Sequence, residues 1–343
     1  MQYEVTIGIP VYRAVDYIEK TMESALAQTF QSIEYLVVDD GGTDGSITVA
    51  ERLQSEHPRG GDIRILYNNQ NCGVGMTRNR ILDEAKGHYL YFLDSDDLIE
   101  TDTIQCLFDK ATMYYADVVY GSLDRIDLVS NTSILPYVIP DKCLLSDDDM
   151  ALYAFKNYSS FQISICNCLM SLKFLRDNKL RFINSVFWED LAFTYEMVTK
   201  VSRAVLASKI TYHYLCRPGS LSHYQDRNML SKSEIFENVS VLDYLKENSK
   251  MLKGKSYLPY YCYNLEMNSF YIVCYILKYY KRIVPAISYS EMQRILSHPL
   301  KMSDILRFDS KRFHNLFFVV LSHLPPVLSM VFVRLLEMIK KII

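Results

Sequence analysis

The chain has 343 residues, of which 49% are hydrophobic, and a formal net charge of -3 at pH 7. This length allows either one large domain with an appendage or two domains. The charge is slightly negative and Lys and Arg do not cluster before the C-terminus, which argues against nucleic acid as a partner. The N-terminus lacks the layout of a signal peptide and the eight cysteines are irregularly spaced, which favours a cytoplasmic protein with reduced thiols.

The first 122 residues predict strands and helices in alternation. Short apolar runs are predicted as buried strands, and segments with helical spacing of apolar residues are predicted as helices. The predicted strands are 5–11, 33–40, 63–67, 88–93 and 117–122, and the predicted helices are 14–28, 46–56, one that opens near Gly75, and 101–115. This alternation predicts an α/β fold, Rossmann-like, with a mostly parallel sheet covered by helices.

Carboxylates follow two of these strands. Asp40 ends the run 33–40, and Asp94, Asp96 and Asp97 follow the run 88–93. Because ligands of parallel sheets bind beyond the carboxyl ends of the strands, the two acidic turns are expected to share one ligand. Close carboxylates require either protonation or a cation, and oxygen ligands favour Mg²⁺ or Mn²⁺. The alternative is an Asp-rich helix N-cap.

The loop 68–75 is polar, contains Gly73, and opens a helix that carries Arg78 in its first turns. Free backbone N–H groups at a helix start can bind an anion or a polar ring. The pair Gly73-x-Gly75 is a weak dinucleotide-binding signal, because the third glycine is absent and the loop follows the third strand.

The segment 124–145 is predicted to be irregular and to contain a hairpin. The pair Cys166-Asn-Cys168 is interpreted as part of the packed core. Glu189 and Asp190 open an amphipathic helix after Trp188, where they serve either as capping charges or in catalysis. A strand-like run at 204–214 contains His213 and is followed by a polar segment with Arg217, both in reach of an anion.

Beyond residue 225 the chain is expected to form a helical C-terminal region, 226–343. Its last 30 or so residues are strongly apolar, but Pro325-Pro326 interrupts them. A membrane span needs about 20 uninterrupted apolar residues, so a broken helix at the bilayer interface, with Lys340 and Lys341 on anionic headgroups, fits better. The alternative is a terminal helix docked on the domain.

The order of the motifs resembles the family 2 glycosyltransferases, which have the GT-A fold. The resemblance covers residues 3–225, and its motifs are Ile9-Pro-Val-Tyr12, Val38-Asp-Asp-Gly-Gly-Thr-Asp-Gly-Ser46, Asn71-x-Gly73, Arg78-Asn79, Leu93-Asp-Ser-Asp-Asp97 and Trp188-Glu-Asp190. The chain departs from the common pattern at Arg13 and Gly42, which affects the contacts to the base.

The resemblance implies a role for each motif. Asp40 would receive the nucleobase and Asp190 would be the general base, with Glu189 as its neighbour. The residues implied in binding the nucleotide sugar are Pro10, Val11, Tyr12, Asp40, Gly73, Arg78, Asp94, Ser95, Asp96 and Arg217. The residues implied in holding Mn²⁺ or Mg²⁺ are Asp96, Asp94 and His213.

The resemblance therefore implies an inverting, metal-dependent glycosyltransferase. It would move one sugar from a nucleoside-diphosphate sugar, expected to be UDP-linked, to a glycan or lipid-linked acceptor in surface polysaccharide biosynthesis (capsule, O-antigen or exopolysaccharide). The expected location is the cytoplasmic face of the plasma membrane, with peripheral contact through the C-terminal segment. The Gln-x-x-Arg-Trp element of processive synthases is absent. The alternatives are a nucleotidyltransferase and a catalytically silent protein that binds nucleotide sugars.

Overall fold

The structure is a computed structural model that describes residues 3–128, 130, 132–157, 164–216 and 229–342. The chain divides into two compact units. The first contains Met1–Met150 and Phe161–Ser220, and the second contains Ala151–Ser160 and Leu221–Ile343. The predicted boundary at 225 lies outside the described residues. Most of helix α5 (Asp149–Lys156) belongs to the second unit, a grouping that the sequence pattern did not indicate.

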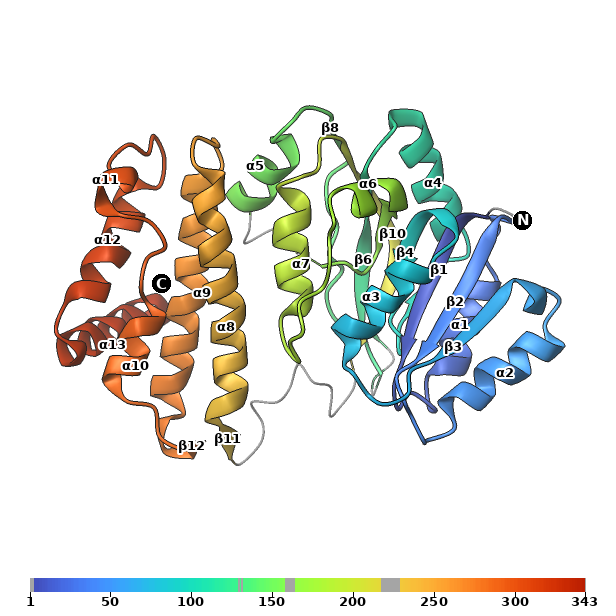
Figure 1. The fold of residues 1–343 in the computed structure, drawn as a ribbon, viewed down its shortest axis with the longest axis horizontal. Coiled ribbons are helices and arrows are strands. Elements are labelled where there is room, and N and C mark those ends of the chain that lie inside the picture. Colours follow the sequence, from blue (N-terminus) through green and yellow to red (C-terminus); the bar gives the residue numbers. More distant parts are fainter. Residues whose placement is uncertain (1–2, 129, 131, 158–163, 217–228, 343) are drawn as a thin grey trace. The chain divides into compact units, whose positions relative to one another are not determined.

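The first unit is an α/β unit (Figure 1). Its strands are β1 (Tyr3–Val11), β2 (Ile33–Asp39), β3 (Ile63–Tyr67), β4 (Gly87–Phe92), β5 (Leu98–Ile99), β6 (Val118–Asp127), β7 (Thr132–Ser133), β8 (Lys142–Leu144), β9 (Cys168–Ser171) and β10 (Ala204–Cys216). Its helices are α1 (Ile18–Leu26), α2 (Ser46–Glu56), α3 (Val74–Glu84), α4 (Thr103–Tyr114), α6 (Leu172–Asp177) and α7 (Glu189–Val198).

The ten strands form one sheet in the order β3-β2-β1-β4-β9-β6-β10-β5, with β7 beside β6 and β8 beside β10. The pairs β2–β3, β1–β2, β1–β4 and β6–β10 are parallel, which confirms the predicted mostly parallel core. Strand β9 runs antiparallel between β4 and β6 and was not predicted. The hairpin expected after residue 124 is confirmed by the antiparallel pair β6–β7.

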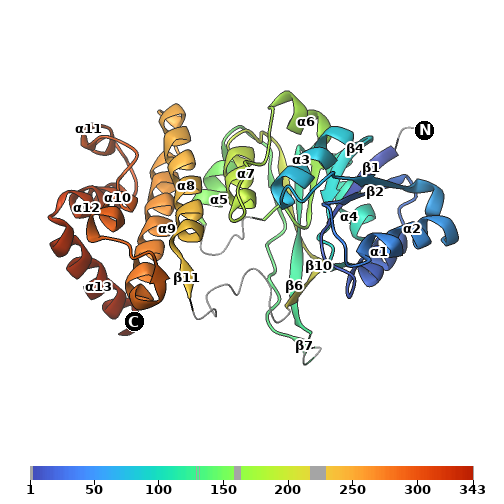
Figure 2. The same ribbon diagram turned by 60° about the horizontal axis from the view of Figure 1, so that its bottom comes forward.

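Helices cover both faces of the sheet, as Figure 2 shows: α3 and α6 lie on one face, and α1, α2 and α4 lie on the other. The second group packs Ile18, Met22 and Leu107 against the buried β1 residues Ile7 and Ile9. Burying each such side chain contributes about 1.5–3 kcal/mol, so this core holds the strand ends rigidly.

The second unit is helical (Figure 1). It contains α8 (Lys232–Ser249), α9 (Leu258–Lys278), α10 (Tyr289–Ile295), α11 (Met302–Ile305), α12 (Arg312–His323) and α13 (Pro326–Ile342), with a short strand pair of β11 (Leu230–Ser231) and β12 (Ile283–Val284). The expected helix break at Pro325-Pro326 is confirmed, because α12 ends at His323 and α13 begins at Pro326. None of the helices described here is long and apolar enough to cross a bilayer.

Candidate active site

The candidate site lies at the carboxyl ends of β1, β2 and β4. Because β1 is parallel to both neighbours, and Val11 pairs with Asp39, the acidic end of β2 and the acidic turn after β4 emerge at the same rim. Pro10 and Val11 are buried at the end of β1, and Tyr12, which follows, has 41% of its surface exposed. The two acidic turns that the sequence predicted to share one ligand are thus on one edge of one sheet.

Asp40 is buried and is held by the loop that precedes α3. Its Oδ1 accepts hydrogen bonds from the Asn68 amide at 2.8 Å and from the backbone N–H of Cys72 at 3.0 Å, and its Oδ2 accepts one from Gly73 N–H at 2.9 Å. Burial alone would raise the pKa of Asp40, but the hydrogen bonds from Cys72, Asn68 and Thr77 outweigh it and lower the pKa. Asp40 is therefore a fixed, ionised acceptor at the rim.

Arg78 connects the acidic turn after β4 to the start of α7. Its two terminal nitrogens donate to Asp94 Oδ1 at 2.7 Å and to Glu189 Oε1 at 2.8 Å. The guanidinium is buried, and its Nε has no hydrogen-bond partner among the described residues. The planar fork of arginine suits this two-sided contact, which lysine cannot reproduce.

Two features of α3 hold the segment before α7 close to this arginine. The Asn79 side chain donates to the carbonyl of Phe182 at 2.8 Å and accepts from Phe182 N–H at 2.9 Å. A Cβ on Gly75 would lie 3.1 Å from Glu189 Cγ and 3.1 Å from the Ile183 carbonyl oxygen, so a larger residue would require these neighbours to shift.

Glu189 and Asp190 form the first turn of α7, after Trp188, which has a left-handed backbone with φ of 60°. Burial raises the pKa of Glu189, and the neighbouring Asp190 adds to this while Arg78 opposes it. Burial also raises the pKa of Asp190, against the effect of Arg78. A carboxylate with a raised pKa is a stronger base than an ordinary aspartate, which suits Asp190 to accept a proton.

Asp97 ties the acidic turn to β10. It accepts hydrogen bonds from the Tyr212 hydroxyl at 2.6 Å and from the backbone N–H of Leu215 at 2.8 Å. Burial raises the pKa of Asp97 well above its usual range, and Asp94 and Asp96 add to the effect. Ser95 is also fixed, because its carbonyl oxygen accepts from Thr21 at 3.1 Å. The turn is therefore anchored at two points.

The rim fits a divalent cation in part. Asp94 and Asp96 are partly exposed carboxylates, the oxygen donors that Mg²⁺ and Mn²⁺ prefer. Asp94, however, already contacts Arg78 and the thiol of Cys166, whose Sγ lies 3.1 Å from Oδ2. Across the described residues, no three His, Cys, Asp or Glu side chains gather as a complete metal site. An ion here would therefore need further ligands from substrate phosphates.

Of the two basic residues that the sequence places near the end of β10, the structure describes His213. His213 Nε2 lies 2.8 Å from Glu100 Oε1, and its Nδ1 is buried without a partner among the described residues. Arg217 lies outside the described residues.

Sequence reasoning missed several residues that hold the site. Cys72 and Asn68 bind Asp40, Cys166 contacts Asp94, and Tyr212 binds Asp97. Cys168 is a buried core residue, as interpreted from the Cys166-Asn-Cys168 pair, whereas Cys166 also reaches the site. Position within or near a motif was a signal for Cys72 and Asn68 alone, because Cys166 and Tyr212 lie far from every motif in the sequence.

An α/β sheet that places two acidic turns on one rim, beside a third acidic pair at a helix start, has the arrangement of a GT-A-type glycosyltransferase. The chain belongs to glycosyl transferase family 2, because the model of that family matches residues 6–178. It is therefore an enzyme that transfers sugars.

Two relatives agree with this assignment, and one solved structure shares the fold. The chain is 30% identical over 226 residues to glycosyltransferase GlyA of Streptococcus pneumoniae, which covers 64% of this chain but only 31% of that protein. It is 25% identical over 283 residues to the cholesterol galactosyltransferase of Borreliella burgdorferi, covering 79% of this chain and 77% of that protein. The fold matches S. aureus TarS 1-349 in complex with UDP-GlcNAc, with a TM-score of 0.63 and 16% identity over 93% of this chain and 89% of that chain.

Proposed function

We propose that this glycosyltransferase inverts the anomeric centre and moves one sugar from a UDP-linked donor to a hydroxyl group of a glycan or lipid-linked acceptor. The observation that carries the proposal is the Arg78 bridge, which holds the acidic turn after β4 and the first turn of α7 together. The carboxylates after β4, which we assign to the donor, then lie close to those of α7, which we assign to the acceptor. Surface polysaccharide biosynthesis is the pathway class that we infer from the family resemblance.

In the proposed reaction, Asp190 removes the proton from the acceptor hydroxyl as that oxygen attacks the anomeric carbon. Attack occurs on the face opposite the leaving nucleoside diphosphate, so the configuration inverts. The raised pKa of Asp190 makes it an effective base near neutral pH. Glu189 binds Arg78 and so fixes the start of α7, which sets where Asp190 lies.

We assign the donor to the rim of β1, β2 and β4. Asp40 would accept from the nucleobase, with Pro10, Val11 and Tyr12 beside the ring and Gly73 at the edge of the pocket. The hydrogen bonds that keep Asp40 ionised support this assignment, because an ionised acceptor binds an imide N–H strongly. Arg78, Ser95 and Arg217 would lie near the diphosphate or ribose.

We propose that Mn²⁺ or Mg²⁺ binds at Asp96 and Asp94 together with phosphate oxygens of the donor; His213, the third residue that the resemblance implied, does not gather with these two carboxylates in the part of the chain that the structure describes. The charge balance supports an ion, because Arg78 offers one positive charge to a cluster that includes Asp94, Asp96, Glu189 and Asp190. Such an ion would offset the charge that develops on the leaving diphosphate.

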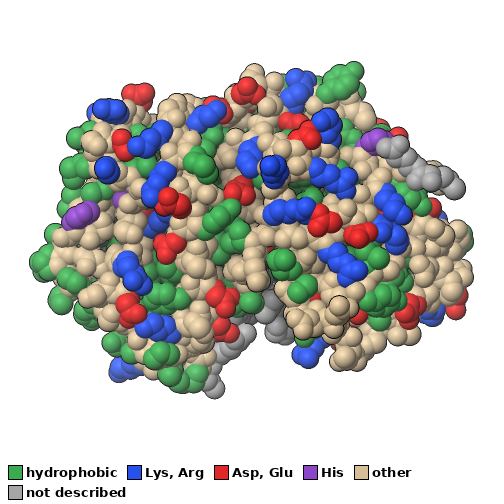
Figure 3. Space-filling view, viewed as in Figure 1, with side chains coloured by type: hydrophobic (Ala, Val, Ile, Leu, Met, Phe, Trp, Pro, Cys, Tyr) green, Lys and Arg blue, Asp and Glu red, His purple; other side chains and the backbone are tan. Residues whose placement is uncertain are grey.

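We infer a position at the inner face of the plasma membrane, where lipid-linked acceptors are made. The support is the run of apolar side chains on α12 and α13, which Figure 3 shows as part of the hydrophobic surface. Contact would be peripheral.

A thermal-shift panel tests the donor and the ion together. UDP-, GDP- and CMP-linked sugars are added with and without Mn²⁺, because a ligand that binds only the folded chain raises its melting temperature. We expect a UDP-sugar to raise the melting temperature most, and only when Mn²⁺ is present. Stabilisation by another nucleotide sugar, or by UDP-sugar equally well in a chelator, contradicts the assignment.

A further inference from the structure

The helices α12 and α13 expose large apolar side chains along one side of each helix. Phe313, with 80% of its surface exposed, is the most open phenylalanine of the set. The exposed residues follow helical spacing on each helix: Phe313, Phe317 and Val320 on α12, and Val327, Leu328, Val331, Phe332, Leu335 and Met338 on α13. Both helices also bury an opposite stripe that includes Phe318 and Val333. Exposed apolar stripes of this extent mark an interaction surface.

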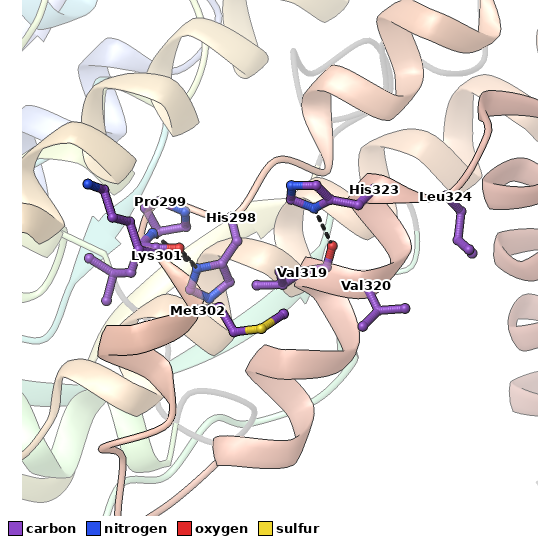
Figure 4. Close-up of a pocket in the computed structure, with 9 residues that line it drawn as sticks. His298, Pro299, Lys301, Met302, Val319, Val320, His323 and Leu324 are labelled. Atoms are coloured by element: carbon purple, nitrogen blue, oxygen red, sulfur yellow. Dashed lines mark hydrogen bonds between the residues drawn. The ribbon is translucent and has the colours of Figure 1, made fainter.

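A cavity of about 710 Å³ lies on one side of α12 (Figure 4). Val319 and Val320 line it from α12, and His298 and His323 lie to either side of Val319. His298 is fixed by Asn315, whose side-chain oxygen lies 3.0 Å from its Nε2. Among the described residues, the lining is otherwise apolar apart from the cation Lys301, and it contains no carboxylate.

A second cavity, of about 360 Å³, lies on the other side of the same helix. It is lined by aromatic and aliphatic side chains from α9, α12 and α13: Tyr263, Met267, Phe270, Phe313, His314, Phe317, Phe318 and Leu336. The ammonium group of Lys311 lies 4.1 Å from the centre of the Tyr263 ring, and the His314 ring meets the same tyrosine edge-on at 5.3 Å. This cavity therefore also pairs an apolar lining with a cation beside it.

The cations placed at these cavities are Lys301, which lines the first, and Lys311, which lies over Tyr263 of the second. From residue 301 to the end, the sequence has seven Lys and Arg against three Asp and Glu, although the whole chain has a net charge of -3. One of the three acids, Asp304, is paired with Lys253 at 3.0 Å. An apolar surface with a basic border complements an amphiphile that has an anionic headgroup.

The same charge pattern disfavours a second copy of the chain as the partner. In a twofold symmetric dimer this face would meet itself, so the basic groups of one copy would approach those of the other. Burial of the apolar side chains would then be opposed by repulsion. A bilayer rich in anionic phospholipid satisfies both the apolar and the basic parts.

We propose that the α12–α13 face is a docking surface for an anionic phospholipid bilayer, with lipid chains entering the two cavities and Lys301 and Lys311 beside the phosphates. This inference rests on the proposed function, since it identifies the partner of the peripheral membrane contact. If lipid chains enter the two cavities, the protein should bind individual lipid molecules as well as the bilayer surface.

Vesicle sedimentation with the full chain tests this proposal. Vesicles of phosphatidylglycerol mixed with phosphatidylcholine are compared with vesicles of phosphatidylcholine alone. We expect binding to the mixed vesicles that weakens with added salt, because exposed charges are screened. Phe313→Asp should lower the partition coefficient about tenfold or more, since it removes one apolar side chain from the lipid phase. Lys311→Gln should reduce the preference for the anionic vesicles.

Met113→Asp is the matched control, because Met113 is 69% exposed on α4 of the other unit. It should leave vesicle binding unchanged. No binding by the wild type, or equal binding by Phe313→Asp, overturns the proposal. A concentration-dependent dimer in light scattering that Phe313→Asp abolishes also overturns it, in favour of a second copy. Donor-dependent release of UDP without vesicles, measured for wild type and Phe313→Asp, tests the proposed function separately, so the two failures are distinguishable.

Discussion

Arg78 lies 2.8 Å from Glu189, although 111 residues separate them in the chain. The same guanidinium lies 2.7 Å from Asp94, so one buried cation joins α3, the turn after β4 and the start of α7. A buried charge is costly unless it is paired, and here each partner depends on the others. Arg78 therefore helps to set the spacing between the turn after β4 and the start of α7.

Replacing Arg78 by methionine should reduce the free energy of unfolding by about 3–5 kcal/mol, because it leaves Glu189 buried without a counter-charge. Urea unfolding measures this change. Arg52→Met is the control, since Arg52 pairs with Glu19 at the surface and should cost no more than about 1 kcal/mol. The double variant Arg78→Met/Glu189→Gln should be more stable than the sum of the single changes indicates; simple additivity would show that the two residues do not interact.

Gly75→Ala should destabilise the protein by about 1–3 kcal/mol and lower transfer activity, because the new methyl group would press on Glu189 and the Ile183 carbonyl. Gly61→Ala is the matched control, since a Cβ there meets nothing within 4 Å. Thermal unfolding of both variants checks the difference. Equal melting temperatures for the two would mean that α3 and the start of α7 are not packed as described.

Asp40→Asn should weaken donor binding about 10- to 100-fold, the usual effect of losing a hydrogen bond to a charged group. Titration calorimetry with UDP measures the dissociation constant. Asp62→Asn, at a partly exposed carboxylate that accepts from Tyr3, should leave UDP binding unchanged. Unaltered UDP affinity in Asp40→Asn would remove Asp40 from the nucleobase pocket.

Much of the first unit could be predicted from local pattern. Helix α2 and strand β3 have the predicted bounds, and β2 differs by one residue. The prediction of these elements is correct because each apolar run is long enough to distinguish a strand from a helix and is bounded by turn residues. The rim that carries Asp40 and Asp94 follows from the parallel order alone, since all carboxyl ends then lie together.

The rest depends on contacts between distant parts of the chain. Strand β9 has only four residues, and it pairs antiparallel with both β4 and β6. Its formation depends on these distant strands, so no local sequence pattern predicts it. Glu189, one partner of Arg78, is 111 residues away in the chain. The sequence suggested a role for Arg78 near the base or diphosphate, whereas its ion pairs appear only in the folded chain. The tyrosine-rich helix α9 buries Glu266, which its aromatic composition did not indicate.

Glu266 should make stability depend on pH. Burial raises its pKa from 4.5 to about 7, although Lys246 lies 3.1 Å away and opposes the shift. The folded chain thus holds this proton more tightly than the unfolded chain does. The resulting stability is fully present below the unfolded pKa and is lost as pH rises through the folded pKa. Urea unfolding between pH 4.5 and about 7 should show a falling free energy of unfolding in wild type but not in Glu266→Gln. The same dependence of stability on pH in both proteins would contradict this role of Glu266.

In the proposed reaction, Asp190, held beside the Arg78 bridge, accepts the proton of the acceptor hydroxyl. The most direct measurement is the steady-state rate of sugar transfer by Asp190→Asn, with UDP affinity measured in parallel and Asp177→Asn, at an exposed carboxylate on α6, as the control. We expect a rate about 10²- to 10⁴-fold below wild type, unchanged UDP affinity and a normal rate in the control. Transfer by Asp190→Asn at the wild-type rate would contradict it.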